Sequence, residues 1–479
     1  MNFRFKRVTH PLAGAVFAAA LCSPAQAAEP QWRPLVEDGS LTGWTIKGGK
    51  ATYAVEDGQI VGRSVGDRAN TFLVTEQSYG DFILEYDVKT DPKLNSGVMI
   101  RGESRPDYRN GVVFGYQVEL DPSPRAWSGG IYDEQRREWL NTLVRNAPAR
   151  AAFKNGDWNH FRVEAIGYSI RTFINGVPAA NLVDDVTARG FIGLQVHGGV
   201  EPGLVVRFRN LRILTQDLAA AATPADPKAD VYNYLPNQLT DAEKAQGWRL
   251  LWDGVSSKGW RGAKLDGFPK QGWSIRDGLL SVVPAGGKES ANGGDIVTSE
   301  QFSDFELELD FRITEGANSG VKYFVDTKLD PIGGPVGSAI GLEYQILDDK
   351  RHPDAKLGEG GNRTLGSLYD LIAAANLSVP DKGKPAMPPG AWNRARIVSR
   401  GKHVEHWLNG VKLVEYERGS ADFRAKMARS KYKDIADFGE LPRGPILLQD
   451  HGNAVSFRSI KIRTPQTTAA APAATQAGR

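Results

Sequence analysis

Two copies of one alternating stretch, "DFILEYDVK" (Asp81–Lys89) and "DFELELDFRI" (Asp304–Ile313), decide the fold class. Apolar and polar residues alternate with period two in both copies, which is typical of strands in a sheet with one buried face. "INGV" (Ile174–Val177) and "LNGV" (Leu408–Val411) place Asn-Gly between further apolar runs, a strong signal for a tight β-hairpin. Helical periodicity is nearly absent, so we expect an all-β chain built from jelly-roll β-sandwiches.

The two halves of the chain repeat the same phrases in the same order. "EDGSLTGW" returns as "WDGVSSKGW", "GYQVELD" as "GLEYQILDD", and "GFIGLQVHG" as "GPILLQDHG". Conserved order from end to end indicates a duplicated domain, because a solenoid stacks many short repeats. We predict one β-sandwich over residues 28–216 and a second over residues 240–465, joined by an Ala/Pro-rich linker at 217–239. Thr240 and Glu243 form a capping box that predicts a short helix at the start of the second copy.

The N-terminal residues predict export. Basic residues, a short apolar run and "AQA" (25–27) have the order of a secretory signal peptide, so we assign residues 1–27 to one. Its removal takes away Cys22, the single cysteine, and leaves a chain without disulfides for the periplasm or the medium. The apolar run is too short to span a bilayer, so no membrane insertion is expected after cleavage. The tail, 466–479, is predicted to be disordered.

Composition and missing motifs narrow the function. The net charge is +3 with acids and bases interspersed, which argues against a nucleic-acid partner. The sequence has no Gly-rich phosphate loop, no zinc-spaced Cys/His cluster and no Gly-x-Ser-x-Gly elbow. His403 and His406 would face opposite sides of one strand and so make a poor metal pair.

Polar side chains gather on the strand faces turned away from the core. Alternation puts Gln449 and His451 on one face, and Gln195 and His197 on the matching face of the first copy. Neighbouring strands add carboxylate–amide pairs two residues apart, about 6.6 Å along the strand, namely Glu343 with Gln345 and Gln117 with Glu119. Such pairs suit the hydroxyl groups of a sugar, although a histidine that only closes a strand end through hydrogen bonds gives the same pattern.

Aromatic residues flank these pairs. Trp127 is expected to be an exposed plate that stacks on a sugar ring, with Tyr132 and Tyr369 beside the polar faces. Trp158 and Trp392 follow turns and are expected to lie in the core.

A cation and a long insertion complete the candidate site. Lys322 aligns with Met99 of the first copy, so Arg101, two residues further on, is the expected substitute there. This mismatch argues against equal activity of the two copies. The insertion at 350–389 is expected to form a long loop at the binding face of the second copy.

Together these motifs resemble the bacterial 3-keto-disaccharide hydrolase domain, once per repeat. The motifs that carry the resemblance are "NSGV", "GYQVELDPSPRAWSGGIYDE", "GLEYQILDD", "GSLYDL", "GDWN" or "GAWN", and "LQDHG". The resemblance implies two tandem concanavalin A-like jelly rolls, frequently exported, that cleave glycosides already oxidised at C3. The acidic strand signature of retaining β-glucanases on this fold is absent, which weakens a hydrolase that uses two carboxylates.

The implied chemistry needs one base. A ketone at C3 makes the hydrogen on C2 acidic, so a base can remove it, the enolate can expel the group on C1, and water can add later. The implied catalytic residues are His451 or Glu343 as the base and Lys322 as the enolate stabiliser, with His197 and Glu119 as counterparts in the first copy. The implied substrate-binding residues are Gln345, Gln449, Tyr369 and Asp348 in the second copy and Gln117, Gln195, Arg101, Trp127 and Tyr132 in the first.

Several alternatives stay open. A tandem lectin-like module would use the same polar faces without catalysis and would tolerate His451→Ala with little more than weaker binding. One copy could catalyse while the other holds substrate. A structural surface protein is disfavoured by the clustered Glu, Gln, His and Tyr positions. The expected partner is an oligosaccharide or glycoside. These residues assign no cofactor, and they leave open a divalent cation held by oxygen ligands. The aglycone, the anomer and the oligomeric state are left open too.

Overall fold

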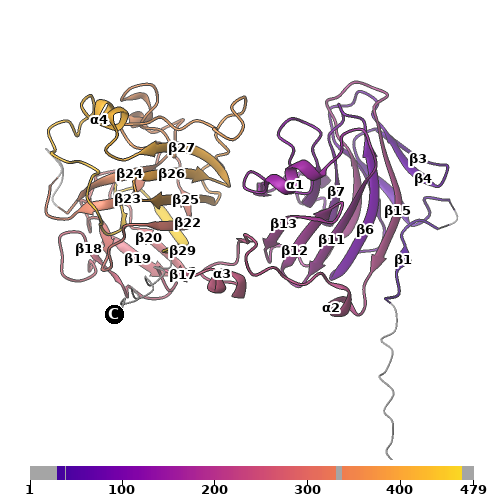
Figure 1. The fold of residues 1–479 in the computed structure, drawn as a ribbon, viewed down its shortest axis with the longest axis horizontal. Helices are drawn as coiled ribbons and strands as arrows, with labels where there is room; N and C mark the ends of the chain where they lie inside the picture. Colours follow the sequence, from indigo (N-terminus) through magenta and orange to yellow (C-terminus); the bar gives the residue numbers. More distant parts are fainter. Residues whose placement is uncertain (1–29, 38, 331–336, 466–479) are drawn as a thin grey trace, which may run out of the picture.

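The computed structural model describes residues 30–37, 39–330 and 337–465 and contains two β-sandwiches that lie side by side (Figure 1). The all-β prediction and the duplication are confirmed. The predicted signal peptide with Cys22, and the predicted tail, lie outside the described residues and stay predictions. Within the described ranges, no helix has both the length and the apolar character needed to cross a membrane.

The first sandwich, indigo to magenta in Figure 1, packs a nine-stranded sheet against a seven-stranded sheet. The larger sheet runs β16-β13-β12-β11-β6-β15-β4-β3, with β1 also paired to β15, over β1 (Arg33–Pro34), β3 (Thr52–Glu56), β4 (Gln59–Arg63), β6 (Phe82–Thr90), β11 (Asn159–Ile166), β12 (Ser169–Ile174), β13 (Val177–Val183), β15 (Val205–Leu214) and β16 (Tyr232–Asn233). The smaller sheet runs β10-β9-β8-β7-β14-β5-β2, over β2 (Trp44–Gly48), β5 (Thr71–Thr75), β7 (Ser96–Ser104), β8 (Val113–Leu120), β9 (Ile131–Glu134), β10 (Glu138–Asn141) and β14 (Phe191–Val196).

The second sandwich repeats this plan with an eight-stranded and a five-stranded sheet. The larger sheet runs β19-β20-β29-β22-β25-β26-β27, with β17 paired to β29, over β17 (Arg249–Leu250), β19 (Trp273–Arg276), β20 (Leu279–Val282), β22 (Phe305–Ile313), β25 (Asn393–Arg400), β26 (His403–Leu408), β27 (Val411–Glu417) and β29 (Val455–Arg463). The smaller sheet runs β18-β21-β28-β23-β24, over β18 (Trp260–Gly262), β21 (Ile296–Thr298), β23 (Asn318–Asp326), β24 (Ile340–Leu347) and β28 (Leu447–Leu448). Short helices are α1 (Ala147–Ala152), α2 (Leu218–Ala221), α3 (Asp241–Ala245), α4 (Ala421–Met427), and the 3-10 turns Arg109–Gly111 and Pro353–Lys356.

Strand alternation explains which face of each sheet is buried. In β6, Leu84 and Tyr86 are fully buried in the apolar core, whereas the intervening Glu85 is bound by arginines on the outer face. The Asn-Gly hairpins form as predicted: Asn175 and Asn409 take φ of 49° and 47°, and the glycine that follows each is left-handed too. Two consecutive left-handed residues are what a two-residue type I′ hairpin requires.

The outer faces of the sheets also hold tryptophans expected in the core. Trp158 and Trp392 are half-buried, which corrects that expectation. Arg209 lies 3.9 Å from the ring centroid of Trp158, and Arg458 lies 4.1 Å from that of Trp392. Each indole therefore forms a cation–π contact with an outer-face arginine from further across the larger sheet, on β15 or β29.

The predicted linker packs against the first sandwich over part of its length. Its strand β16 adds to the larger sheet in parallel with β13. Upstream, the hydroxyl of Thr223 donates to the Glu164 carboxylate at 2.7 Å. The linker then enters α3, where the capping box is confirmed: Glu243 N–H donates to Thr240 Oγ1 at 3.1 Å, and Thr240 N–H donates back to the Glu243 carboxylate at 2.8 Å.

Removing the cap should weaken the start of the second domain. Thr240→Ala takes away the hydroxyl that satisfies an otherwise free helix N–H, so we expect a loss of about 1 kcal/mol in the free energy of unfolding. Urea unfolding followed by tryptophan fluorescence measures it. Thr240→Ser, which keeps the hydroxyl, should match the wild type; equal stability of all three proteins would contradict a structural role for the cap.

Candidate functional site

Two cavities lie on the sheet faces turned away from the cores, one in each sandwich. The second-domain pocket has a volume of about 240 Å³ and is lined by Glu289, Asn318, Lys322, Ala339, Ile340, Gly341, Glu343, Gln345, Tyr369, Lys431, Tyr432, Ile435, Gln449 and His451. The first-domain pocket has a volume of about 340 Å³ and is lined by Asn70, Asn95, Gln117, Glu119, Arg125, Tyr132, Glu134, Gln135, Trp139, Gln195 and His197. The structure thus brings most of the predicted site residues together, in matching places of the duplicated fold.

A buried carboxylate, that of Glu343, lines the second-domain pocket. The register of β23 and β24 sets Glu343 directly opposite Lys322. Burial raises the pKa of Glu343 to about 7, against the opposing effect of the Lys322 and Lys431 ammonium groups. A Cβ on Gly320 would collide with the Glu343 carboxylate, so the glycine of "NSGV" leaves room for it. A carboxyl group with a pKa near 7 is suited to general-base chemistry at neutral pH.

The cation opposite Glu343 is also buried. Lys322 Nζ donates to Ala339 O at 3.1 Å and lies 3.7 Å from Asp295 Oδ2. Burial alone disfavours the ammonium, but Asp295, Glu343 and Glu289 outweigh it and raise the pKa of Lys322. The pocket therefore holds a fixed positive charge beside a base.

The remaining polar residues of this pocket have free hydrogen-bonding capacity. Both amide atoms of Gln345, Gln449 Oε1 and His451 Nδ1 are buried and have no hydrogen-bond partner among the described residues. Gln449 Nε2 donates to Glu289 at 3.2 Å, which fixes the orientation of that amide. The ring of His352 meets the His451 ring edge-on at 5.7 Å, and burial together with His451 lowers the pKa of His352. Buried polar atoms without partners are uncommon, and a hydroxyl-rich ligand would satisfy them.

Two insertions contribute residues to the pocket lining, and the sequence pattern predicted one of them. Tyr369, from the predicted insertion, donates its hydroxyl to Asp354 Oδ2 at 2.8 Å. Lys431 Nζ lies 4.2 Å from the Tyr369 ring centroid, and the neighbouring Tyr432 and Ile435 also line the pocket. These three residues follow α4, and their segment was missed. The available signal was length, because residues 417–444 replace the much shorter stretch 183–190 of the first copy.

The first-domain pocket uses the same strand register with different side chains. In β7 and β8, Met99 lies opposite Gln117, and Gly97 lies opposite Glu119. Glu119 accepts hydrogen bonds from Asn95 Nδ2 at 2.6 Å and Gln117 Nε2 at 3.1 Å. Burial nevertheless raises the pKa of Glu119 to about 7. The acid and the amide have exchanged places relative to the second domain, and among the described residues no lysine lines this pocket.

Trp139, rather than Trp127, forms the aromatic wall of the first-domain pocket. Trp127 is buried in the core and packs edge-on against Trp139, with ring centroids 4.8 Å apart, which corrects the expectation of an exposed plate. Trp139 is half-buried, lines the pocket and meets Tyr132 at 5.3 Å. His197 lines the same pocket, with Nδ1 2.5 Å from the carbonyl of Gly198.

Arg101 does not line either pocket, which corrects its expected role as a substitute cation. It has a φ of 47° at an irregularity in the β7–β8 register, so its side chain leaves the pocket face. The guanidinium donates to Gly167 O at 2.9 Å and to Asp81 at 3.1 Å. In the second domain Arg418 donates to the Gly401 carbonyl at 3.2 Å. A structural arginine thus ties the same hairpin turn in both copies.

Asp348 is also structural, which corrects its expected place at the substrate. Its carboxylate accepts the backbone N–H groups of Gly316 at 2.8 Å and Lys350 at 3.1 Å. Burial alone would raise its pKa, but these hydrogen bonds and Arg351 outweigh it and lower the pKa of Asp348. The aspartate closes the turn at the end of β24 and is absent from the pocket lining.

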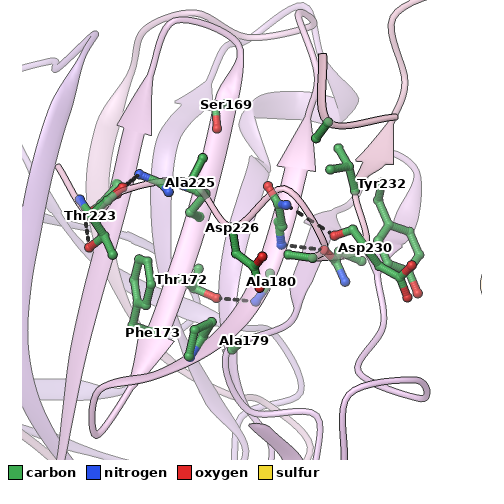
Figure 2. Close-up of a pocket in the computed structure, with 18 of the residues that line it drawn as sticks. Ser169, Thr172, Phe173, Ala179, Ala180, Thr223, Ala225, Asp226, Asp230 and Tyr232 are labelled. Atoms are coloured by element: carbon green, nitrogen blue, oxygen red, sulfur yellow. Dashed lines mark hydrogen bonds and ion pairs between the residues drawn. The ribbon is translucent and has the colours of Figure 1, made fainter. Parts of the chain in front are cut away.

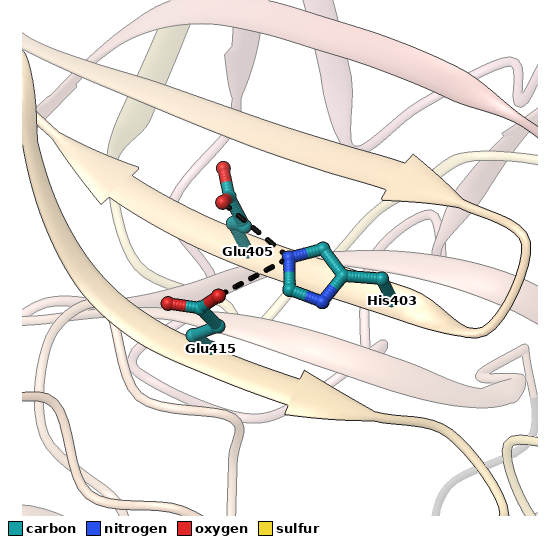
Figure 3. Close-up of side chains that lie close together, drawn as sticks. All are labelled: His403, Glu405 and Glu415. Atoms are coloured by element: carbon teal, nitrogen blue, oxygen red, sulfur yellow. Dashed lines mark hydrogen bonds and ion pairs between the residues drawn. The ribbon is translucent and has the colours of Figure 1, made fainter. Parts of the chain in front are cut away.

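A group of possible metal ligands lies on the outer face of β26 and β27 (Figure 3). In the described part of the chain, His403, Glu405 and Glu415 form the one such group found, and His403 Nε2 lies 3.4 Å from each carboxylate. Lys412 Nζ already donates to both, at 2.8 and 2.9 Å, so we interpret the group as an ion-pair cluster. His406 faces the core, and burial lowers its pKa to about 4, which confirms that the two histidines make a poor metal pair.

The largest cavity described, about 710 Å³, lies between the linker and the outer face of β12 and β13 (Figure 2). Phe173, Ala179, Ala180 and Ala225 form apolar parts of the wall labelled there, beside polar side chains such as Thr223 and Asp226. Charged residues of this cavity bind other residues of its own wall: the Glu164 carboxylate accepts a hydrogen bond from Thr223, and Asp230 pairs with Arg145 at 3.2 Å. We therefore assign the chemistry to the two smaller pockets.

Glu119 provides a test of the pocket's electrostatics. The native state holds its proton up to about pH 7, and the unfolded state only to about pH 4.5, so stability is lost as pH rises between these values. Glu119→Gln should unfold with a free energy up to about 3 kcal/mol above that of the wild type at pH 8, with the gain shrinking towards pH 4. Urea unfolding across this range measures it.

The matched control is Glu405→Gln. Burial alone would raise the pKa of Glu405, but bonds from Lys412 and Trp407 outweigh it and lower the pKa, so that substitution should destabilise the protein at pH 8. A Glu119→Gln gain that did not change with pH would contradict the assignment.

Comparison with known proteins agrees with the duplicated architecture. The model of the 3-keto-alpha-glucoside-1,2-lyase-like domain matches residues 31–214 and 247–463. A 3-keto-disaccharide hydrolase of Bacteroides thetaiotaomicron is 35% identical over 236 residues, which cover 46% of this chain and 79% of that protein. A crystal structure from Parabacteroides distasonis, described as a candidate glycosyl hydrolase, is 31% identical with a TM-score of 0.40 and covers 48% of this chain and 99% of that one. A carbohydrate binding module from Bacillus subtilis is 20% identical with a TM-score of 0.26 and covers 36% and 96%. The chain belongs to the 3-keto-α-glucoside-1,2-lyase-like domain family and carries the family's domain twice.

Proposed function

We propose that this chain is an enzyme that cleaves the glycosidic bond of 3-keto-glycosides or 3-keto-disaccharides, and that the second-domain pocket carries the reaction. The observation that carries the proposal is the strand pair that sets the Glu343 carboxyl, with a pKa of about 7, opposite the buried ammonium of Lys322. Family membership and the printed name of the Bacteroides relative support the substrate class.

The reaction would proceed by elimination. Glu343 removes the proton from C2, which the C3 ketone makes acidic, and the electron pair moves onto the C3 oxygen as an enolate. When the enolate collapses, the C2–C1 double bond forms, the bond from C1 to the glycosidic oxygen breaks, and the leaving oxygen takes up a proton. Addition of water across the new double bond then gives the free 3-keto sugar, so one water is consumed overall.

The other pocket residues have complementary roles in this scheme. Lys322 would stabilise the negative charge on the C3 oxygen, since a fixed cation in a buried site acts strongly on developing charge. His451, whose Nδ1 has no partner among the described residues, is the second candidate for proton transfer and would serve the leaving oxygen. The free amide atoms of Gln345 and Gln449 would bind sugar hydroxyls.

A purely lectin-like second domain is the less favoured alternative. Burying an ammonium and two carboxylates costs stability unless the charges are closely compensated, and hydrophobic residues of similar size usually pack at least as well. Recognition of neutral hydroxyls needs no such charges. Their presence beside an acid with a near-neutral pKa therefore favours catalysis.

Substitution of the charged pair tests the proposal. With a 3-keto-disaccharide as substrate, Glu343→Gln should lower kcat/KM by about 10²–10⁴-fold, and Lys322→Met by about 10²–10³-fold. Because Glu343 acts as a base, kcat/KM should rise with pH and level off above about pH 7. Lys322→Met removes a charge that opposes the rise in the pKa of Glu343, so its residual activity should need a higher pH.

Three controls make the result specific. Glu415→Gln, an exposed carboxylate on β27 outside the pocket, should keep wild-type turnover. The unoxidised parent disaccharide should not be cleaved, and deuterium at C2 of the keto substrate should slow release if proton removal limits the rate. Equal cleavage of the oxidised and unoxidised sugars would overturn the elimination mechanism.

A further inference from the structure

We propose that the first-domain pocket is a binding site for an unoxidised sugar, which it holds without cleaving. The proposal rests on the proposed function only for the claim that turnover belongs to the second domain. The duplicated register allows a residue-by-residue comparison of the two pockets on the same backbone frame.

The buried ion pair of the second domain joins Lys322 to Asp295. Both of these residues are replaced in the first domain. Met99 lies opposite Gln117 where Lys322 lies opposite Glu343. Phe72 lies opposite Gln195 in the first domain. In the second domain the same strand register places Asp295 beside Gln449, so Phe72 stands where the second domain has Asp295.

Apolar side chains also surround the positions in the first domain that correspond to Lys322 and Asp295. Phe72, Val74, Met99, Val113 and Phe191 form a closed apolar cluster in the first domain. The corresponding cluster of the second domain contains the smaller Ala263 and Ala339, with Val297, Val325 and Leu447. Apolar side chains thus occupy the place at which the second domain holds an ammonium.

One basic side chain, Arg125, does line the first-domain pocket, but it is already engaged. Arg125 Nε donates to Asp121 at 2.7 Å, and its guanidinium stacks 4.7 and 4.8 Å from the rings of Trp127 and Trp139. Burial raises the pKa of Glu119, and the charge of Arg125 opposes this rise less than the hydrogen bonds from Asn95 and Gln117 do. A site whose cation is already paired with another carboxylate is poorly equipped to stabilise an enolate.

What the pocket retains suits a neutral sugar. Gln117 and Gln195 are 2% and 0% exposed, and Gln117 Oε1 and Gln195 Nε2 have no partner among the described residues. One is a free acceptor and the other a free donor, which together match a hydroxyl group. Tyr132 and Trp139 add apolar ring faces on the same pocket wall. Its volume, about 340 Å³, is within the usual range of small-molecule sites.

Hydrogen–deuterium exchange of the full chain with trehalose tests the inference, since this neutral glucose disaccharide has no carbonyl group. We expect trehalose to protect β9 and β10 (Ile131–Asn141) more strongly than the strands that carry Glu343 and Lys322. Trp139→Ala should weaken trehalose binding at least ten-fold. Gln195→Leu, which removes the free donor without enlarging the pocket, should do the same if Trp139→Ala fails to fold.

Turnover locates the reaction independently of binding. With 3-keto-trehalose, Glu343→Gln should lower the release of sugar by the same factor of about 10²–10⁴, while protection of Ile131–Asn141 by trehalose persists. Absence of first-domain protection at saturating trehalose would overturn the inference. The inference would also be overturned if the Glu343→Gln protein still released sugar and the double variant Glu343→Gln/Glu119→Gln did not. If the wild type releases nothing from the keto sugar yet shows first-domain protection, the proposed function fails and the binding site stands.

Discussion

The burial of one positive charge governs the architecture of the second pocket. An ammonium at Lys322 in a low-dielectric site is tolerated only with opposite charges close by, and Asp295, just before β21, and Glu343, on β24, supply them. The same requirement explains the small residues around it, since larger side chains would fill the space of the ion pair. The near-neutral acid opposite follows from this arrangement, because burial disfavours its ionised form while the ammonium partly restores it.

The first sandwich is a natural comparison for this constraint. There a methionine and a phenylalanine stand at the positions of the ion pair, and the strands keep the same partners and the same register. A charged site and an apolar cluster thus occur on one sheet design, because the backbone hydrogen bonds that define the sheet do not depend on the side chains of its outer face. The two copies therefore share one scaffold, although one pocket holds a buried ion pair and the other has apolar side chains at the same positions.

The sequence pattern predicted most of the fold and many of the pocket residues. Where it misplaced or missed a residue, there is a physical cause. Period-two alternation and the Asn-Gly pairs predicted the sheets and hairpins, and alternation also gathered Gln345, Glu343, Gln117 and Glu119 on their pocket faces. Arg101 was misplaced because a register irregularity interrupts the alternation on which the prediction depended. Trp127 and Lys431 lie in loops, where no period relates sequence position to side-chain direction. The raised pKa values of the two glutamates arise from burial by distant segments, which a single strand does not reveal.

The linker has a consequence for how the chain can be divided. Asn233 belongs to β16 of the first sheet, yet its side chain donates to Glu243 at 2.8 Å, and Glu243 accepts in turn from Lys461 of β29 at 2.7 Å. One glutamate therefore joins the last strand of one sandwich to a buried lysine of the other. A cut on either side of Asn233 removes a strand from the first domain or a hydrogen bond from the second. The two repeats are separate units of descent, but the covalent boundary between them does not separate two self-sufficient pieces.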